Sequence, residues 1–275
     1  MTLLEVLGRQ FPDSSKTTLR QMLQRGRVRV NGEIEKDSKR QIGDDERVDV
    51  AEKSVARAFP PVLALLHEDD DVLVVLKSQG LLTVATERER ERTAYRRLRD
   101  WIAGRSPDAS RLFIVHRLDR ETSGLIVFAK SPAAKQHLQA QFAARTAERV
   151  YVALVEGVMT QAEGSLSSRL VEDRSLRVRE AERGGGKEAI TRYRVLERRR
   201  ATTLLELRLV TGRRAQIRAQ LAAAGHPIAG DGQYGGRTDS LKRLALHATR
   251  LAFVHPRGGR VSFESPMPAA FGRRA

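Results

Sequence analysis

Asp119 is the residue of this sequence whose surroundings best suit a catalytic carboxylate. It lies in a polar segment between Arg117 and Arg120, and Gly124 then begins a compact apolar run that ends at Lys130. Opposite charges nearby stabilise an ionised carboxylate, so Asp119 would be available as a nucleophile or a base at neutral pH. The spacing alone also fits a structural ion pair in front of a buried strand, because perturbed carboxylates are often structural.

Two further segments carry polar side chains that could assist such a carboxylate. Tyr151 lies in an apolar, strand-like segment, where a tyrosine is most often a core residue. Its ring could also stack on a base, with the hydroxyl at the ring edge. Arg213 and Arg218 lie at the start of a predicted helix, whose first turn favours anions. A basic, solvated turn explains the same pattern.

Several other kinds of site are excluded by the residue pattern. His116, His226 and His247 are isolated in the sequence, with no pair at ligand spacing, so no metal site is predicted. No glycine-rich phosphate loop or dinucleotide fingerprint occurs, and no cofactor is expected. The chain has no cysteine, which excludes disulfides and thiolate catalysis.

The charge balance favours a polyanionic partner. The 275 residues include 50 basic and 34 acidic side chains, a net charge of +16, and most of the basic ones are Arg. Because Arg binds phosphate through two parallel hydrogen bonds and stacks on bases, a nucleic acid is the expected partner. Biased codon usage could also raise the Arg content. An aromatic content of 5% argues against a broad base-stacking platform.

A family resemblance surrounds Asp119. Residues 116–124 read H-R-L-D-R-E-T-S-G and match, without a break, the H-R-L-D-x-x-T-S-G signature of the RluA-type RNA pseudouridine synthases. The similarity continues to Lys130. This resemblance implies that Asp119 is the catalytic residue. It also implies isomerisation of a uridine in RNA to its carbon-linked isomer, with no cofactor and no metal.

Later segments resemble further motifs of the same family, in the family order. Arg149–Gly157 is similar to K-x-Y-x-A-x-V-x-G, with Arg149 in place of Lys. Gly212–Arg218 is similar to G-R-x-H-Q-I-R, with Ala215 in place of His, and residues 244–248 resemble a late L-x-L-H-A strand. The resemblance therefore spans almost the entire chain.

The resemblance assigns roles to side chains in these segments. Tyr151 would lie against the target base and assist removal of a ring proton, and Leu246 would pack against both. Arg218 would pair with Asp119 through a planar fork and hold it as an ionised, oriented carboxylate. Whether Asp119 attacks the sugar or the uracil ring stays open. The side chains expected to contact RNA or the base around this site are His116, Arg117, Arg120, Thr122, Lys130 and Arg213.

Residues 1–51 are expected to form a separate, small RNA-binding domain. Two short helices are predicted, the second capped by Ser14 or Ser15, followed by a strand and a tight turn at Asn31-Gly32. The R-V-x-V-N-G sequence at 27–32 resembles the ribosomal-protein-S-four type of RNA-binding domain. A cationic face could contact phosphate, although a solvated helix face explains it equally well. Its candidate residues are Lys16, Arg20, Arg25 and Arg29.

The remaining chain is predicted to consist of a linker over residues 52–61 and a catalytic domain over 62–275. Apolar runs predict buried strands, and periodic segments with cap and stop signals predict helices. Their irregular alternation predicts an α+β domain with a mixed, mostly antiparallel sheet and flanking helices, next to the small N-terminal α/β domain. The main predicted strands cover 72–76, 149–155, 190–196, 204–210 and 246–253, and helices are predicted from 132 and 214.

Structured RNA is the expected partner, with large-subunit ribosomal RNA favoured by analogy and transfer RNA as the nearest alternative. Two alternatives belong to other classes: a non-catalytic RNA-binding assembly factor, and a hydrolytic glycosidase in which Asp231 completes a carboxylate pair with Asp119. No apolar run is long enough to span a membrane, and we recognise no signal peptide. A cytoplasmic protein and a monomer are expected.

Overall fold

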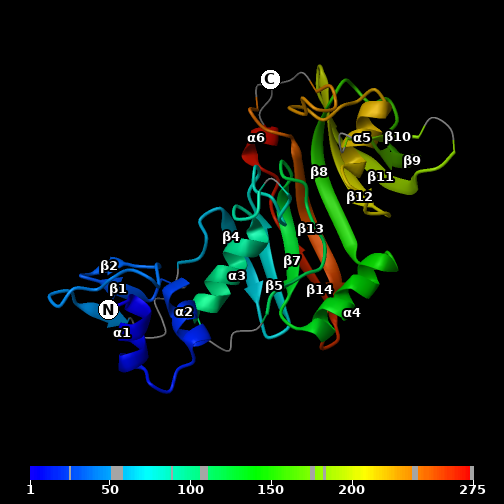
Figure 1. The fold of residues 1–275 in the computed structure, drawn as a ribbon. Coiled ribbons are helices and arrows are strands. Elements are labelled where there is room, and N and C mark those ends of the chain that lie inside the picture. Colours follow the sequence, from blue (N-terminus) through cyan, green and yellow to red (C-terminus); the bar gives the residue numbers. More distant parts are fainter. Residues whose placement is uncertain are drawn as a thin grey trace. The chain divides into compact units, whose positions relative to one another are not determined.

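The computed structural model describes residues 1–24, 26–50, 58–87, 89–105, 111–173, 177–181, 184–236 and 241–272. The chain divides into two compact units (Figure 1). One consists of Met1–Ala58 with Asp100–Ala109, and the other of Phe59–Arg99 with Ser110–Ala275. The boundaries predicted at residues 51 and 61 stay predictions, because most of the predicted linker lies outside the described residues.

The first unit packs two helices on a small antiparallel sheet. Helices α1 (Leu3–Gln10) and α2 (Lys16–Gln24) precede strands β1 (Val28–Val30), β2 (Glu33–Ile34) and β3 (Val48–Val50), in the order β2-β1-β3. The apolar side chains of both helices and of β1 form one core, because each element buries one face. Its fully buried members are Leu3, Leu7, Leu19, Leu23, Val28 and Val30.

Local signals place the ends of these elements. Thr2 and Glu5 form a reciprocal capping box at the start of α1, and the Oγ of Ser15 accepts a hydrogen bond from the Thr18 N–H at the start of α2. Asn31 and Gly32 both have positive φ, 51° and 86°, between β1 and β2. This is the backbone that a two-residue hairpin turn needs, so the turn predicted here is confirmed.

The second unit is built on one mixed sheet. Within its described residues, 11 strands form the order β10-β9-β11-β12-β8-β13-β7-β5-β4, with β14 on β13 and β6 on β7. Only β13 and β7 pair in parallel among these strands. The predicted fold class is therefore confirmed. The strands are β4 (Leu63–Glu68), β5 (Val72–Lys77), β6 (Phe113–Ile114), β7 (Ser123–Ala129), β8 (Glu148–Glu156), β9 (Glu163–Glu172), β10 (Val178–Glu180), β11 (Lys187–Arg198), β12 (Thr202–Leu209), β13 (Leu246–Val254) and β14 (Arg260–Glu264).

Helices cover two parts of this sheet (Figure 1). Helix α4 (Pro132–Ala143) packs Ala134 and Leu138 onto the apolar faces of β5, β7 and β13. Helix α5 (Gln216–Ala223) packs against β9 and β10. The chain also forms α3 (Ala94–Arg105) and the short α6 (Ala269–Gly272). The start of α4 follows the predicted signal, since Ser131 caps it and Pro132 occupies its first position.

The parallel contact of β7 with β13 depends on Gly124. Its φ is 123°, and a Cβ there would lie 2.4 Å from both the N and the O of Ala248. Only a residue without a side chain allows the two backbones to approach this closely. The glycine after the Asp119 loop thus joins the strand that follows the loop to the strand that carries Leu246.

Several elements were not predicted from the sequence. Residues 164–187 are polar and Arg-rich, and the sequence did not predict strands there, yet they contain β9 and β10. β9 exposes one face to solvent, so polar residues alternate along it and no apolar run marks the strand. The predicted helix from 214 begins two residues later, at Gln216.

Candidate active site

Asp119, Tyr151 and Arg218 line one cavity of about 440 Å³ in the second unit. They come from a loop, from β8 and from α5, so segments far apart in the sequence converge on the same space. His116, Arg117, Thr122, Arg213 and Leu246 line the same cavity. Of the side chains predicted around Asp119, only Arg120 and Lys130 lie outside its lining.

The Asp119 loop is held by backbone hydrogen bonds on both sides of the carboxylate. The hydroxyl of Thr83 donates to the Leu118 carbonyl over 2.8 Å and accepts from the Leu118 N–H over 3.1 Å. The Thr122 N–H donates to the Asp119 carbonyl over 3.2 Å. These bonds fix the main chain while the Asp119 carboxylate itself stays partly exposed, at 22%. The loop therefore presents a positioned but accessible anion.

Lys77 supports this loop from below. It is fully buried at the end of β5, and its Nζ donates to the carbonyls of Ser78, Leu81 and Arg120 over 2.9, 2.8 and 3.2 Å. Burial lowers the pKa of Lys77 to about 8, although nearby acidic groups oppose that shift. Three backbone carbonyls thus replace the hydrating water of the Lys77 ammonium group, and through it the turn after β5 is bonded to the Asp119 loop.

Arg218 is placed by Asp231 rather than by Asp119. Its Nε and Nη2 each donate to one carboxylate oxygen of Asp231 over 2.7 Å, and Nη2 also reaches Gln233 over 3.1 Å. Its Nη1 lies 3.8 Å from Oδ2 of Asp119, a charge contact beyond hydrogen-bond range. The prediction that a planar fork grips Asp119 is wrong, because Asp231, 1% exposed, occupies the fork.

The contacts of Asp231 with Arg218 argue against the glycosidase alternative, in which Asp231 and Asp119 would act as a catalytic carboxylate pair. Burial alone would lower the pKa of Arg218, but the hydrogen bonds and charge of Asp231 raise it above the ordinary value. Tyr234 adds its ring, whose centre lies 4.9 Å from the Arg218 guanidinium carbon. A carboxylate that is buried and fully engaged by Arg218 is not available as a general acid.

Tyr151 faces the cavity from the middle of the sheet. It lies on β8, paired with Leu207 of β12 and with Ala248 of β13, and is 6% exposed. Burial raises the pKa of its hydroxyl to about 12. The charge of Arg149 opposes this shift, and the smaller effect of Asp119 adds to it. Tyr151 is therefore a neutral phenol at neutral pH. Leu246, on the neighbouring strand, provides apolar lining beside it.

Gln216 organises the segment before α5. Its Oε1 accepts from the Thr211 hydroxyl over 2.8 Å and from the Arg213 N–H over 3.0 Å. Ala215, where the family usually has His, takes a left-handed conformation with φ 45° and provides no side-chain cap. Gln216 thus ties the segment before the helix to the first residue of α5, and Arg213 and Arg214 lie just in front of the helix.

An aromatic cluster borders the cavity on another side. The rings of His116 and Phe142 stack with centres 4.6 Å apart, and the guanidinium carbon of Arg149 lies 5.4 Å from the centre of the Phe142 ring. Nε2 of His116 accepts from the Val127 N–H over 3.2 Å. Burial, with a smaller contribution from Arg149, lowers the pKa of His116 to about 3, so this imidazole is neutral.

A buried polar chain lies behind the loop. Ser123 Oγ and Nδ1 of His247 are 2.8 Å apart, and Nε2 of His247 lies 3.0 Å from Ser265 Oγ. Arg243 donates to Ser123 Oγ over 2.6 Å. Burial, assisted by the charge of Arg243, lowers the pKa of His247 to about 4. This chain fixes Ser123, the first residue after the Asp119 loop.

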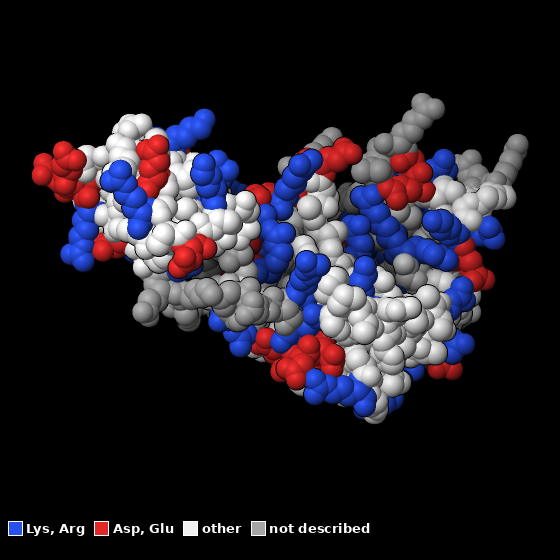
Figure 2. All heavy atoms as spheres, turned by 60° about the horizontal axis from the view of Figure 1, so that its bottom comes forward, with Lys and Arg blue, Asp and Glu red and all other residues white. Residues whose placement is uncertain are grey.

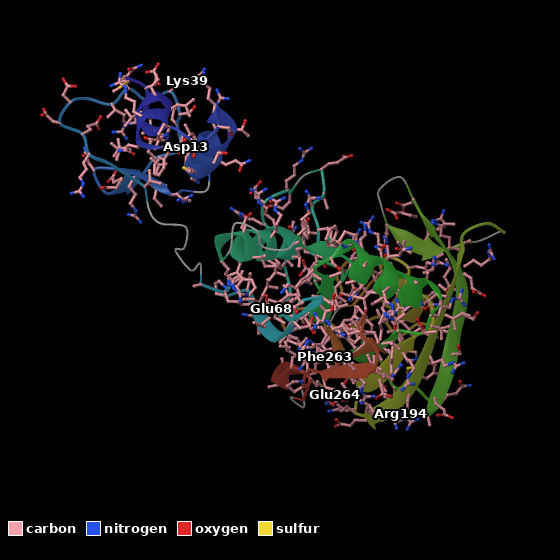
Figure 3. The ribbon with its side chains drawn as sticks, turned by 90° about the horizontal axis from the view of Figure 1, so that it is seen from below. Asp13, Lys39, Glu68, Arg194, Phe263 and Glu264 are labelled. Carbon is pink, nitrogen blue, oxygen red and sulfur yellow. The ribbon has the colours of Figure 1, made fainter. Side chains whose placement is uncertain are left out.

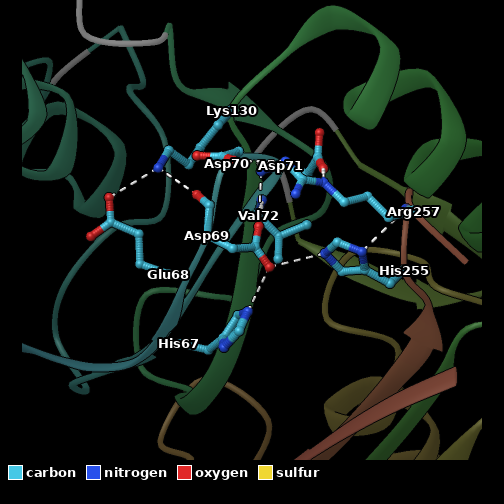
Figure 4. A network of polar contacts seen from close by, with 9 residues as sticks. All are labelled: His67, Glu68, Asp69, Asp70, Asp71, Val72, Lys130, His255 and Arg257. Atoms are coloured by element: carbon cyan, nitrogen blue, oxygen red, sulfur yellow. Dashed lines mark hydrogen bonds and ion pairs between the residues drawn. The ribbon is translucent and has the colours of Figure 1, made fainter. Parts of the chain in front are cut away.

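Lys130 belongs to a different network (Figure 4). Its Nζ donates to Glu68 over 3.0 Å and to the Asp69 carbonyl over 2.5 Å, and only 11% of its side chain is exposed. Arg120, the other residue outside the cavity lining, donates through Nε to the Gly80 carbonyl over 3.1 Å. Both cations bond to neighbouring turns, and neither belongs to the cavity's lining.

The same network contains a group of potential metal ligands. Donor atoms of Asp69, Asp71 and His255 lie within 4.8 Å of one another. However, Oδ2 of Asp69 is 2.7 Å from Nε2 of His67 and 3.0 Å from Nε2 of His255, and Asp71 accepts from Arg257 over 2.6 Å. Figure 4 shows these partners converging on the turn. Protein groups therefore already engage these oxygens.

The cationic residues predicted in the first unit are exposed. Lys16 and Arg20 lie on α2 and Arg29 on β1, where its Nη1 donates to the Gly32 carbonyl over 2.7 Å. Arg25 lies outside the described residues. On the viewed surface of the molecule, Lys and Arg side chains gather in several clusters (Figure 2). Exposure makes phosphate contact by these side chains sterically feasible.

Lys77 and Arg149 shape the site but received no role from the sequence, and Asp231 was considered only as half of a carboxylate pair with Asp119. Lys77 ends a continuous apolar run, and a lysine at the buried end of a strand is unusual enough to have served as a signal. Arg149 departs from the family motif, in which Lys is usual. The burial of these side chains depends on strands and loops that meet only in the folded chain, which spacing cannot reveal.

Comparison with known proteins identifies the family. The family model of RNA pseudouridylate synthases matches residues 71–223, and the S4 domain model matches residues 1–48. The chain belongs to the RNA pseudouridylate synthase family, and the resemblance seen in the sequence is confirmed. It is therefore an isomerase that acts on RNA and forms pseudouridine.

Individual relatives extend over most of the chain. The ribosomal large subunit pseudouridine synthase D of Neisseria meningitidis serogroup A is 37% identical over 284 residues, which cover 96% of this chain and 75% of that protein. The protein of the same name from Haemophilus ducreyi is 33% identical over 286 residues, 97% of this chain and 87% of that one.

A solved structure supports the fold. Human RNA Pseudouridylate Synthase Domain Containing 4 superimposes with a TM-score of 0.64 at 23% sequence identity, over 76% of this chain and 90% of that chain. At this identity the likeness concerns the fold alone. Among the described helices of the present protein, none has the length and apolar character needed to cross a membrane.

Proposed function

We propose that the protein converts a uridine of large-subunit ribosomal RNA to pseudouridine, with Asp119 as the catalytic residue. The observation that carries this proposal is the convergence of Asp119, Tyr151, Arg218 and Leu246 on one cavity. The names of the two bacterial relatives and the match to an S4 domain support ribosomal RNA over transfer RNA.

In this proposal Asp119 attacks the target nucleotide, at the anomeric carbon of the sugar or at the uracil ring. The bond between base and sugar breaks, and the base rotates. Its carbon five then bonds to the anomeric carbon, and the bond to Asp119 breaks, which regenerates the carboxylate. Arg218 places positive charge 3.8 Å from one oxygen of Asp119 without engaging that oxygen in a hydrogen bond. The carboxylate keeps lone pairs for the nucleophilic step.

Tyr151 assists removal of the proton from carbon five. Because burial holds its pKa near 12, Tyr151 acts as a neutral phenol. Its oxygen can accept that proton only while its own hydroxyl proton passes to solvent water in the cavity, so it serves as a relay and not as a stored negative charge. Its ring and Leu246 present apolar surface on which a flipped base can stack.

A target nucleotide inside a helix has to be flipped out to reach this cavity. Arg117 and Arg213 line the cavity as well, and their charges suit the flanking backbone of the RNA. Residues 1–51 are proposed to add a second RNA contact through Lys16, Arg20, Arg25 and Arg29, joined by residues 52–61 to the catalytic part, 62–275. A cytoplasmic monomer is proposed for the whole chain.

The test is a pseudouridine map of large-subunit ribosomal RNA and of total transfer RNA, each transcribed without modifications and incubated with the protein. Wild type should produce one or a few new pseudouridines in the ribosomal RNA, and Asp119→Asn should produce none while binding the RNA with similar affinity. Conversion confined to transfer RNA would overturn the substrate assignment. Normal conversion by Asp119→Asn would overturn the role of Asp119.

A further inference from the structure

Arg149 is a buried cation on the cavity wall, and no counterion for it lies among the described residues. It is 8% exposed and lines the cavity. Among the residues that the structure describes, no hydrogen bond or ion pair engages its guanidinium, and its buried Nε has no partner. An isolated buried charge is strongly unfavourable unless it is paired and hydrogen-bonded. The partner that compensates this charge has to come from outside the protein.

Packing, and not polar contact, fixes the position of Arg149. Its guanidinium lies over Phe142, and its Nη1 would be 2.2 Å from a Cβ at position 212. Gly212 therefore gives the guanidinium room to lie against the backbone just before Arg213. A methyl group at Gly212 would push the guanidinium away from this place without removing its charge.

His116 lies beside Arg149 in this part of the cavity. Because Nε2 of His116 accepts a hydrogen bond from the Val127 N–H, the ring proton is on Nδ1, a donor. His116 stacks on the same Phe142 ring. The lining near Phe142 thus combines an unpaired guanidinium with an imidazole N–H donor, and both groups suit an acceptor that carries negative charge.

The chemistry of a nucleotide identifies the anion. A uridine in RNA has a neutral base and a neutral ribose, and only its phosphodiester groups are charged. We propose that Arg149 binds a phosphodiester group adjoining the target uridine, an inference that rests on the proposed RNA substrate. Arg218 cannot provide this contact, because the carboxylate of Asp231 already neutralises it. Arg149 thereby locks the flipped nucleotide to the wall of the cavity.

The test neutralises one phosphate at a time. A hairpin of large-subunit ribosomal RNA that the full-length protein converts is synthesised with native linkages or with an uncharged methylphosphonate directly 5′ or 3′ to the target uridine. Single-turnover rates and dissociation constants are measured for wild type, Arg149→Met, Gly212→Ala and Arg194→Met. Arg194 lies on β11 in the view of Figure 3, is exposed and pairs with Glu206, so it controls for the loss of one positive charge.

One of the two methylphosphonates should raise the dissociation constant of wild type and of Arg194→Met by about tenfold. This is the scale of a lost hydrogen bond to a charged group. The same replacement should change the dissociation constants of Arg149→Met and Gly212→Ala by less than about twofold, because these variants have already lost the phosphate contact. Equal sensitivity of wild type and Arg149→Met to both methylphosphonates would overturn the proposal.

A second measurement does not depend on the identity of the RNA substrate. Without RNA, Arg149→Met should unfold at the same temperature as wild type or higher, because replacing an uncompensated buried charge by an apolar side chain removes a cost. A decrease of more than about 5 °C would show that Arg149 is a structural residue and would overturn the inference. If wild type converts no large-subunit RNA, the substrate assignment fails and this measurement still decides about Arg149.

Discussion

The cavity is bordered by two buried arginines in opposite electrostatic states. Arg218 holds the carboxylate of Asp231 with two hydrogen bonds of 2.7 Å, whereas Arg149 has no charged partner among the described residues. A cation that the protein neutralises is fixed in place and contributes geometry. A cation that the protein leaves uncompensated retains its attraction for a ligand anion. The two sides of the cavity therefore divide positioning and binding between them.

The paired side also leaves the carboxylate of Asp119 without a hydrogen bond from Arg218. If Arg218 formed its fork with Asp119, both carboxylate oxygens would be held. Because Asp231 takes the fork, Asp119 receives only a charge contact of 3.8 Å. Substitutions that remove the partner of Arg218, or change its contacts, test whether a neutralised arginine positions the site while an uncompensated arginine binds a ligand anion.

Asp231→Ala should have the largest effect. It leaves Arg218 as an uncompensated buried cation, and breaking a buried pair costs about 3–5 kcal/mol of stability. Urea unfolding measures this loss, and the rate of isomerisation should fall as Arg218 becomes free to move. Asp231→Asn, which keeps one acceptor, is the matched control and should lose less. Unchanged stability of Asp231→Ala would mean that the pair does not hold Arg218.

Arg218→Lys should slow isomerisation by about a hundredfold, the scale of a small misplacement in an active site. Lysine keeps the charge but cannot engage both oxygens of Asp231 and reach Asp119 at once. Single-turnover rates at saturating RNA measure the effect, and Arg218→Ala should be slower still. A lysine variant as fast as wild type would show that charge alone suffices and that the fork is unimportant.

His247 is a third kind of buried ionisable group: it is neither a paired nor an unpaired charge, because the fold keeps it neutral. The fold holds its pKa at about 4, whereas the unfolded chain binds a proton below about pH 6.5. As the pH falls from 6.5 to 4, the free energy of unfolding should therefore decrease by up to about 1.4 kcal/mol per pH unit from this residue. Denaturation at pH 7.5 and pH 5 measures it. His247→Gln should show a shallower pH dependence than wild type, and an equal slope would contradict the expectation.

The smallest effect concerns exposed cations of the first unit. Lys16 and Arg20 have no ion pair among the described residues, whereas Arg47 pairs with Asp49 over 3.0 Å. Lys16→Gln and Arg20→Gln should each reduce the slope of log affinity against log salt by about one. Arg47→Gln is the matched control and should leave that slope unchanged. The same slope for all three variants and wild type would exclude α2 as an RNA contact.

Local signals in the sequence predicted much of the fold. The turn at Asn31-Gly32, the cap at Ser131-Pro132 and the apolar run of β5 depend on neighbouring residues and are confirmed. The strand β9 was not predicted, because its alternating pattern of small and polar residues lacks an apolar stripe. Its place in the sheet comes from pairing with β11, a partner that only the folded chain reveals.

In the candidate site, too, features set by neighbouring residues were predicted and features set by distant contacts were not. The motif around Asp119 and the family were recognised from the sequence and are confirmed as a resemblance, while the role of each side chain stays a proposal. The predicted charge contact of Arg218 with Asp119 is present at 3.8 Å, but the predicted fork engages Asp231 instead, since two acidic residues lie within reach and spacing cannot rank them. The burial of Lys77 and Arg149 depends on strands that meet only in three dimensions.

The junction of β7 and β13 has a consequence for how this protein is made. The bond between Ser123 and His247 joins residues 124 positions apart, and closing so long a loop costs entropy before any contact offsets it. A chain emerging from the ribosome in N-to-C order can form the first unit early, but the strand that completes the site arrives near the end of synthesis. A nascent chain can therefore hold RNA through its first unit before it can modify it, and activity begins only after β13 has joined the sheet.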